Sequence, residues 1–99
     1  MAANIPVRRS PMQYHVEIKP TAQKTLAKIP QSQRERISKR IDRLADNPRP
    51  SGLKKLAGES ILYRIRVGEY RIVYEIHDDV LVVLVVRIGT RADVYRNLP

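Results

Sequence analysis

The chain of 99 residues contains no cysteine, no tryptophan and no phenylalanine. Without cysteine it can form neither a disulfide bond nor a thiolate metal site, and this absence suits a reducing compartment. Without tryptophan and phenylalanine, the core must consist of aliphatic side chains and a few of the five tyrosines. The length allows one small core but not two. We therefore expect a single domain over residues 13–99, preceded by a flexible basic leader over residues 1–12.

Long apolar runs and acidic residues are also scarce. The longest apolar run, residues 80–86, is far shorter than the roughly 20 residues of a transmembrane helix. The first residues lack the apolar segment of a secretory signal, so we expect a cytoplasmic protein without membrane contact.

Ten acidic residues against 19 lysines and arginines give a formal charge of +9. This balance favours a polyanionic partner, either nucleic acid or an acidic protein.

The motifs of common hydrolases are missing as well. There is no nucleophile elbow, no glycine-rich phosphate loop, no Walker motif and no metal-binding cluster. The two histidines, His15 and His77, have no evident partner, and we expect both to be ordinary surface residues. We expect no metal and no cofactor.

The order of hydrophobic patterns predicts an α+β fold. Residues 14–19 alternate between apolar and polar, as in a half-buried strand, and Thr21 is expected to cap a first helix. Apolar side chains one helical turn apart predict a second helix over residues 31–45. Three further strands follow between residues 61 and 90. We expect two N-terminal helices packed on one face of a twisted, mainly antiparallel four-stranded sheet, in the order β-α-α-β-β-β.

Residues 61–76, ILYRIRVGEYRIVYEI, predict a β-hairpin with a two-residue turn at Gly68 and Glu69. This turn would place Tyr63, Ile65, Val67 and their apolar partners on the core side of the sheet. Arg64 would point to the other side, where Arg66 would lie directly opposite Arg71. Like charges in such pairs are destabilising. The sequence therefore predicts an anion-binding face.

The register of the last strand depends on the length of the loop around residues 78–79. A two-residue turn would place Arg87 opposite Tyr70, on the core side. One extra loop residue would place Arg87 opposite Arg71, on the basic face. We favour the second register because it keeps the core side free of charge, and it leaves the outer face concave and basic.

Basic side chains in the second half of the chain indicate phosphate contacts, because the arginine fork matches phosphate oxygens. The set predicted on one face is Arg64, Arg66, Arg71, Arg87 and Arg91. Metal-free RNA cleavage requires that the 2′-hydroxyl attack the adjacent phosphate, and DNA lacks this hydroxyl. Tyr95 is the candidate proton acceptor, because nearby arginines favour its phenolate. On the residues alone, a nuclease and a non-catalytic basic binding module both remain open.

Further lysines and arginines are candidates for nucleic-acid docking. We select Lys54, Lys55, Arg87, Arg34, Lys39 and Arg43. The last three lie on the exposed surface of the second helix together with Arg36 and Arg40. That surface is either a solvated helix face or a phosphate contact.

The segments LKKLAG, YRIRVGEYRIVYEI and VVRIGTRADVY resemble the RelE/ParE superfamily of bacterial toxins, most closely its RelE-type branch. The resemblance covers roughly residues 14–95. It implies a microbial-RNase-like fold and a small basic toxin that cuts mRNA in the ribosomal A site by 2′-hydroxyl attack, without a metal. It also implies an acidic antitoxin that wraps around the toxin.

Carried over by position, the family's catalytic residues fall on Arg64, Arg66, Arg71, Arg91 and Tyr95. Arg71 is then expected at the scissile phosphate. There are two departures: many relatives have histidine where this chain has Thr90, and some have a longer segment between Arg91 and Tyr95. The first alternative function is inhibition of DNA gyrase, as in ParE-type members, which share the fold but lack most of this set. The second is a non-catalytic module that binds RNA or a partner.

Overall fold

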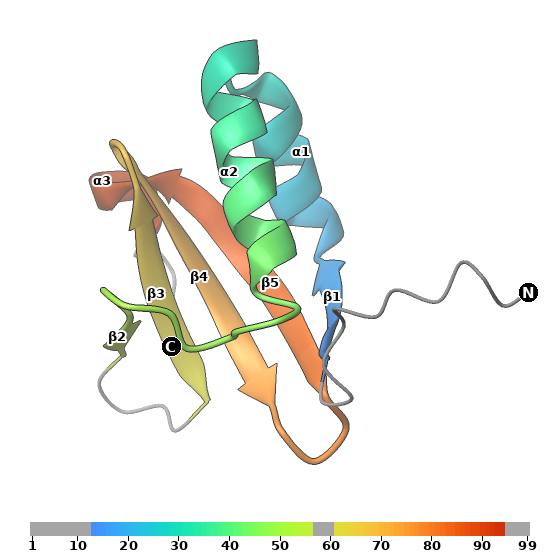
Figure 1. Cartoon of the computed structure of the whole chain (residues 1–99). Helices are drawn as coiled ribbons and strands as arrows, with labels where there is room; N and C mark the ends of the chain where they lie inside the picture. The colour runs from blue at the N-terminus through green and yellow to red at the C-terminus, as the bar shows by residue number, and fades with distance from the viewer. Residues whose placement is uncertain (1–12, 57–60, 95–99) are drawn as a thin grey trace, which may run out of the picture.

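The computed structural model describes residues 13–56 and 61–94. Two longer helices and a five-stranded sheet form two layers, with a short helix at the end (Figure 1). The elements are β1 (His15–Ile18), α1 (Pro20–Lys28), α2 (Gln31–Arg43), β2 (Lys54–Lys55), β3 (Leu62–Val67), β4 (Tyr70–His77), β5 (Val82–Thr90) and α3 (Arg91–Val94). None of the described helices is long and apolar enough to cross a membrane. The expected leader over 1–12 lies outside the described residues.

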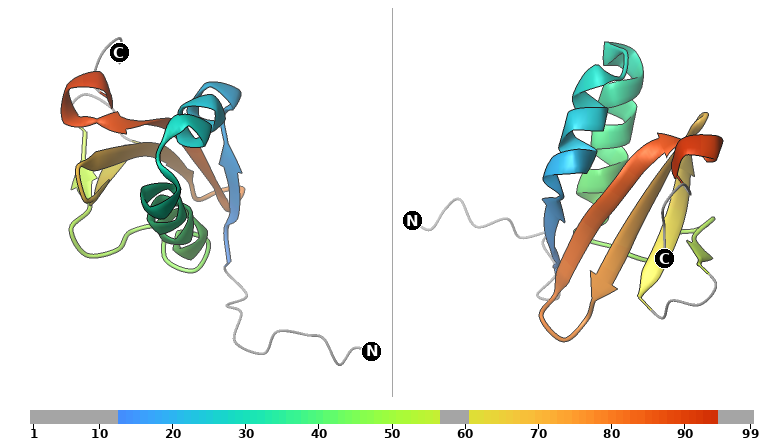
Figure 2. Two further views of the ribbon diagram at one scale, coloured as in Figure 1. Left: turned by 90° about the horizontal axis from the view of Figure 1, so that it is seen from above. Right: turned by 180° about the vertical axis from the view of Figure 1, so that it is seen from behind.

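The sheet has the strand order β1-β5-β4-β3-β2. Only β1 and β5 run parallel, and the other neighbours are antiparallel. Helices α1 and α2 pack on one face of the sheet, and α3 lies on the other (Figure 2). This arrangement confirms the predicted fold class.

Two details of the prediction were wrong. The sheet has five strands instead of four, because Lys54–Lys55 pairs with β3 as the short edge strand β2. Helix α1 begins at Pro20, with Lys19 at the N-cap, so Thr21 does not cap it. Proline suits the first helical position because its φ angle is already helical and its missing N–H would have no partner there.

The β3–β4 hairpin has the predicted register. Val67 faces Tyr70, and Arg66 faces Arg71. Gly68, the first residue of the two-residue turn, has φ 60°, which glycine adopts at little cost. The turn therefore fixes which side chains of β3 and β4 reach the core.

Both registers considered for β5 were wrong. The loop between β4 and β5 has four residues, 78–81, and the pairing shifts by one residue between Val73 and Tyr74. Arg87 consequently faces Val73, while Arg71 faces Gly89. The shift acts as a β-bulge, which inserts one unpaired residue into a strand. Arg87 still lies on the outer face, because directly paired residues share a side of the sheet.

The main core lies between the helices and the sheet and is aliphatic apart from tyrosine, as expected. Its most buried members include Ile37, Ile41, Leu44, Ile65, Ile72, Tyr74, Val83 and Val85. A second, smaller cluster lies on the outer face, where Val94 of α3 packs with Leu62 and Val73. The outer face was predicted to be basic, but it is basic only in part, because α3 covers an apolar patch on it.

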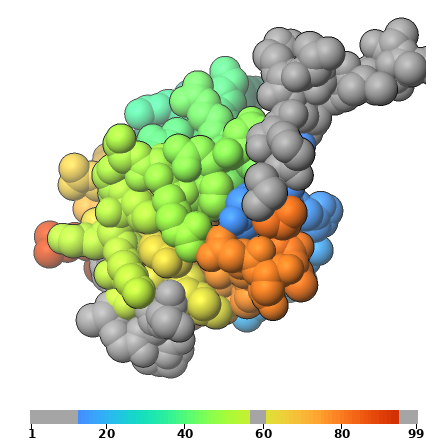
Figure 3. All heavy atoms as spheres, turned by 60° about the horizontal axis from the view of Figure 1, so that its bottom comes forward, coloured from blue at the N-terminus to red at the C-terminus, as the bar shows by residue number. Residues whose placement is uncertain are grey.

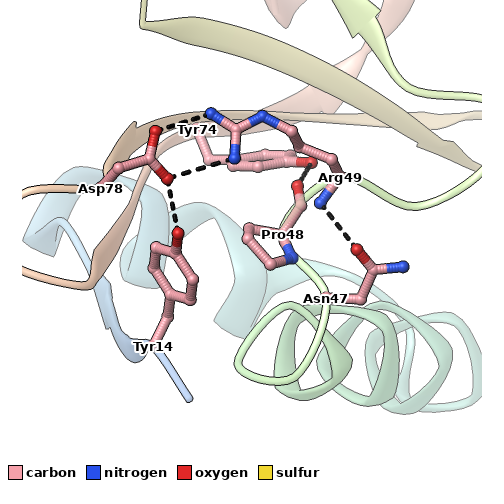
Figure 4. A network of polar contacts seen from close by, with 6 residues as sticks. All are labelled: Tyr14, Asn47, Pro48, Arg49, Tyr74 and Asp78. Carbon is pink, nitrogen blue, oxygen red and sulfur yellow. Dashed lines mark hydrogen bonds and ion pairs between the residues drawn. The ribbon is translucent and has the colours of Figure 1, made fainter. Parts of the chain in front are cut away.

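A polar network joins the α2–β2 loop to the far end of the sheet (Figure 4). Arg49 donates from Nη1 and Nη2 to the two carboxylate oxygens of Asp78, at 3.1 and 2.8 Å, and Tyr14 donates to the same carboxylate. The Tyr74 hydroxyl, which is buried, donates to the carbonyl oxygen of Pro48 at 2.7 Å. Figure 3 shows this loop, in green, against the β4–β5 hairpin, in orange, and β1, in blue. The network therefore ties three distant segments together.

The network also shifts two pKa values. The hydrogen bonds from Arg49, then from Tyr14, lower the pKa of Asp78 from 3.8 to about 2. The hydrogen bond to the Asp78 carboxylate, more than burial, raises the pKa of Tyr14. The carboxylate of Asp78 is thus stabilised in its charged form by folding.

We predict that Asp78→Asn lowers stability at pH 7 and that its difference from the natural chain narrows in acid. Because folding depresses the pKa of Asp78, its contribution is complete above about pH 5 and is lost as the pH falls from about 4 through about 2. Urea unfolding at pH 7, 4 and 2.5 measures this. Asp79→Asn is the control, because Asp79 makes no hydrogen bond or ion pair within the described residues. A stability difference that does not change with pH would contradict the prediction.

Candidate nucleic-acid interface

The sheet register places basic residues in two neighbouring rows on the outer face. In the first row, Lys54 of β2 faces Arg64 of β3, which faces Val73 of β4, which faces Arg87 of β5. In the second row, Arg66 faces Arg71, which faces Gly89. The structure therefore brings Arg64, Arg66 and Arg71 together on adjacent strands, as predicted from the hairpin.

Arg71 is the charged residue at the centre of this group. It is only 9% exposed, and it is the one buried charged residue in the described part of the chain. Its Nη1 lies 3.4 Å from the carbonyl oxygen of Glu69, in the turn, and 3.5 Å from that of Tyr70. These contacts point the guanidinium towards the hairpin turn. A buried positive charge next to the exposed Arg66 makes this end of the sheet strongly attractive to anions.

Arg64 is half-buried, and its Nε is buried without a hydrogen-bond acceptor among the described residues. A buried donor of a charged group is costly when it has no acceptor. This cost adds to that of the like-charge pair on the same face.

The remaining predicted positions lie around the edges of the group. Arg87 is on the outer face but two strands from Arg64, and it lines a hollow beside α1 with Thr21 and Thr25. Arg91 is exposed at the start of α3, which packs against β4 and β5 on the same face. Tyr95 lies outside the described residues.

Thr90, at the position of the family histidine, is engaged in local structure. It faces Tyr70 across the sheet, on the core side, and its hydroxyl donates to a carboxylate oxygen of Asp93 at 3.2 Å. This contact joins the end of β5 to the first turn of α3. Thr90 therefore does not lie among the outer-face arginines.

Basic residues of α2 form a second group beside the hairpin turn. A groove of about 290 Å³ is lined by Arg36, Lys39, Arg40, Arg43, Arg66, Val67 and Gly68. Lys39 and Arg43 were selected from the sequence, and Arg36 and Arg40 were placed on the same helix surface without being selected. Their spacing of three and four residues puts all four on one side of α2. Arg66 belongs to both groups.

Two selected residues lie apart from either group. Arg34 donates from Nη1 to the carbonyl oxygens of Ala27 and Ile29, at 3.1 and 3.4 Å, and so satisfies the end of α1. Lys55 faces Tyr63, on the opposite side of the sheet from Lys54. Strand alternation separates Lys55 from Lys54 once the pair is recognised as a strand, whereas helical periodicity does not show that Arg34 contacts the end of α1.

The histidines do have partners, contrary to expectation. Nε2 of His15 lies 3.2 Å from Glu17, and Nε2 of His77 lies 2.8 Å from Glu75. Each pair joins residues two apart on one strand, and both pairs lie on the outer face. Within the part of the chain that the structure describes, no cluster of three or more His, Asp or Glu side chains could hold a metal ion.

Comparison with known proteins gives consistent matches. A family model described as "ParE toxin of type II toxin-antitoxin system, parDE" matches residues 16–95. The chain is 30% identical over 89 residues to a putative toxin RelE1 of Methanocaldococcus jannaschii, covering 87% of this chain and 99% of that protein. It is 34% identical over 89 residues to a putative RelE-like toxin protein of Escherichia coli, covering 85% and 92%.

Solved structures agree with these sequence matches. A chain of the archaeal RelE–RelB complex of Pyrococcus horikoshii superposes with a TM-score of 0.73 at 28% identity, covering 82% of this chain and 98% of that one. The isolated RelE toxin of E. coli gives a TM-score of 0.70 at 30% identity, covering 83% and 90%. The likeness thus extends over nearly all the described residues.

We predict that Arg66→Gln raises the free energy of unfolding by about 0.2–1 kcal/mol at low salt, because it removes the like-charge pair with Arg71. The gain should shrink in 1 M NaCl, where exposed charges are screened. Urea unfolding at both salt concentrations measures it. Lys24→Gln on the exposed side of α1 removes the same charge elsewhere and should change stability less. A destabilised Arg66→Gln variant would show that the pair does not repel.

Proposed function

The chain belongs to the family of toxins of type II toxin–antitoxin systems, and we propose that it is a RelE-type endoribonuclease that cleaves mRNA on the ribosome without a metal ion. The observation that supports this most is the row of arginines on β3 and β4, with buried Arg71 facing exposed Arg66 and with Arg64 on the same face.

In the proposed reaction, the 2′-hydroxyl of the substrate attacks the adjacent phosphate, and the 5′-oxygen of the next nucleotide leaves. Negative charge accumulates on the pentacoordinate phosphorus during this step. Arg71 and Arg64 neutralise that charge, and one well-placed donor of this kind contributes roughly 3–4 kcal/mol to transition-state stabilisation. The arginines are fixed in place by the sheet, so little reorganisation is needed when the charge develops.

Proton transfer needs a group other than arginine, because the guanidinium stays protonated at neutral pH. We assign acceptance of the 2′-hydroxyl proton to Tyr95, by its position in the family pattern. Arg66 and Arg91 contribute by charge, favouring both the phenolate and the departing oxygen. Thr90 donates to Asp93 of α3 and does not take the place of the family histidine, so in this scheme the departing 5′-oxygen takes its proton from water.

We also propose that the partner in the cell is a cognate acidic antitoxin. Solved complexes of relatives pair RelE with RelB, as in P. horikoshii and M. jannaschii. A formal charge of +9 makes an acidic partner the natural complement. Such a partner would compete with RNA for the arginines of β3 and β4.

We predict that Arg71→Ala lowers mRNA cleavage in a cell-free translation reaction by about 100-fold or more, as expected for loss of one transition-state donor. Primer extension on the mRNA, with detection of 2′,3′-cyclic phosphate ends, measures cleavage. Lys24→Ala, on the exposed side of α1, should cleave as the natural chain does. Circular dichroism checks that Arg71→Ala is folded, because the variant also removes the hydrogen bonds from Arg71 to the hairpin turn. Undiminished cleavage would exclude Arg71 from the reaction.

Inhibition of DNA gyrase is the second candidate function, because the matching family model is described by the ParE toxin. A supercoiling assay with the purified chain distinguishes the two. Lost supercoiling together with intact mRNA in the translation reaction would favour the gyrase inhibitor. Cut mRNA with normal supercoiling would favour the nuclease.

A further inference from the structure

Four basic residues form a straight stripe along α2, outside the arginine group on the sheet. Arg36, Lys39, Arg40 and Arg43 line the same groove. The stripe spans about 10 Å, at 1.5 Å per helical residue. Like charges three and four residues apart on a helix repel each other. This arrangement is unfavourable unless an anion lies against it.

The opposite wall of the groove is the β3–β4 turn. Arg66, Val67 and Gly68 line it, and a Cβ atom at Gly68 would lie 3.7 Å from Nη1 of Arg36. The helix and the hairpin turn are therefore close enough for one ligand to touch both. None of the described lining residues carries a carboxylate. The groove thus presents positive charge from two sides.

We propose that this groove is a second phosphate-binding site, which holds the backbone of paired RNA next to the strand that is cut on the sheet face. The choice of RNA as ligand rests on the proposed function. A stripe of about 10 Å is long enough to contact more than one phosphate of a nucleic-acid strand, since even in duplex DNA successive phosphates of one strand advance only about 3.4 Å along the axis. Arginine forks suit these phosphates better than point charges do.

The lining of the groove indicates paired rather than single-stranded RNA. Proteins that hold single strands stack bases on aromatic side chains. None of the described lining residues is aromatic, so the groove offers no ring on which an unpaired base could stack. Its arginines and lysine suit phosphate oxygens, and backbone contacts are how double-stranded RNA is mostly bound.

An acidic protein segment fits this groove less well than phosphate does. Its one apolar lining side chain, Val67, is buried. A protein helix would find a better surface between α1 and α2, where Ile18, Leu26 and Ala27 line a groove of about 590 Å³. The two grooves share only Lys39. The structure thus offers separate surfaces for phosphate and for an amphipathic helix.

The test uses the full chain and a fluorescent RNA hairpin made entirely of 2′-O-methyl nucleotides, which cannot be cut by 2′-hydroxyl attack. Arg36→Gln/Arg43→Gln should weaken its binding at least tenfold and make the salt dependence less steep by about two, one per lost phosphate contact. The matched control, Lys24→Gln/Lys28→Gln, removes two charges from α1. It should change affinity less than threefold.

Three results would overturn the proposal. The two double variants could lose affinity equally, which would reduce the groove to diffuse charge. An unpaired 2′-O-methyl RNA could lose as much affinity as the hairpin, against the expected loss below threefold. Finally, an acidic polyglutamate peptide could lose affinity while the RNA hairpin does not, which would make the groove a protein site.

This measurement is independent of cleavage. If binding of the RNA hairpin depends on Arg36 and Arg43 but the chain never cuts mRNA, the proposed nuclease activity is wrong and the proposed groove site stands. If mRNA is cut but binding of the RNA hairpin does not depend on either residue, the proposed groove site is wrong and the nuclease activity stands. Thermal unfolding of both double variants confirms that each is folded, since all four substituted side chains are exposed.

Discussion

The two-residue turn at Gly68–Glu69 is the constraint on which the rest of the structure depends. With Gly68 at φ 60°, the turn allows only one pairing of β3 with β4. A slip by one residue would move Ile72 to solvent and Arg71 into the core, since side chains alternate between faces. The same turn therefore determines both which residues build the core and which arginines meet on the outer face.

The positive charge is concentrated rather than spread over the outer face. The apolar cluster under α3 occupies part of that face, and the Glu17–His15 and Glu75–His77 pairs lie at its other end. The arginines are left at the end near the hairpin turn, next to α2. The repulsion among them is tolerated because the core and the Arg49–Asp78 network hold the sheet and helices from the opposite end.

The sequence was sufficient where a local signal existed. The β3–β4 register followed from one glycine and strict alternation, and it brought Arg64, Arg66 and Arg71 together correctly. The β4–β5 register did not follow, because all residues of 80–86 are apolar and none marks the bulge. Likewise, helical periodicity placed Arg34 and Arg36 alike on an exposed surface. Only the packing of α2 against the hairpin decides that Arg36 lines the groove while Arg34 caps α1.

Arg66 couples the two basic groups, since it faces Arg71 on the sheet and also lines the α2 groove. An anion at either place lowers the repulsion between Arg66 and its neighbours, and binding to the folded chain stabilises it. An anion bound at one group also weakens the attraction of a second anion to the other group, because it partly neutralises the charge of Arg66, which both groups share. An acidic partner that contacts Arg66 alone would therefore weaken anion binding at both groups, although it would cover neither.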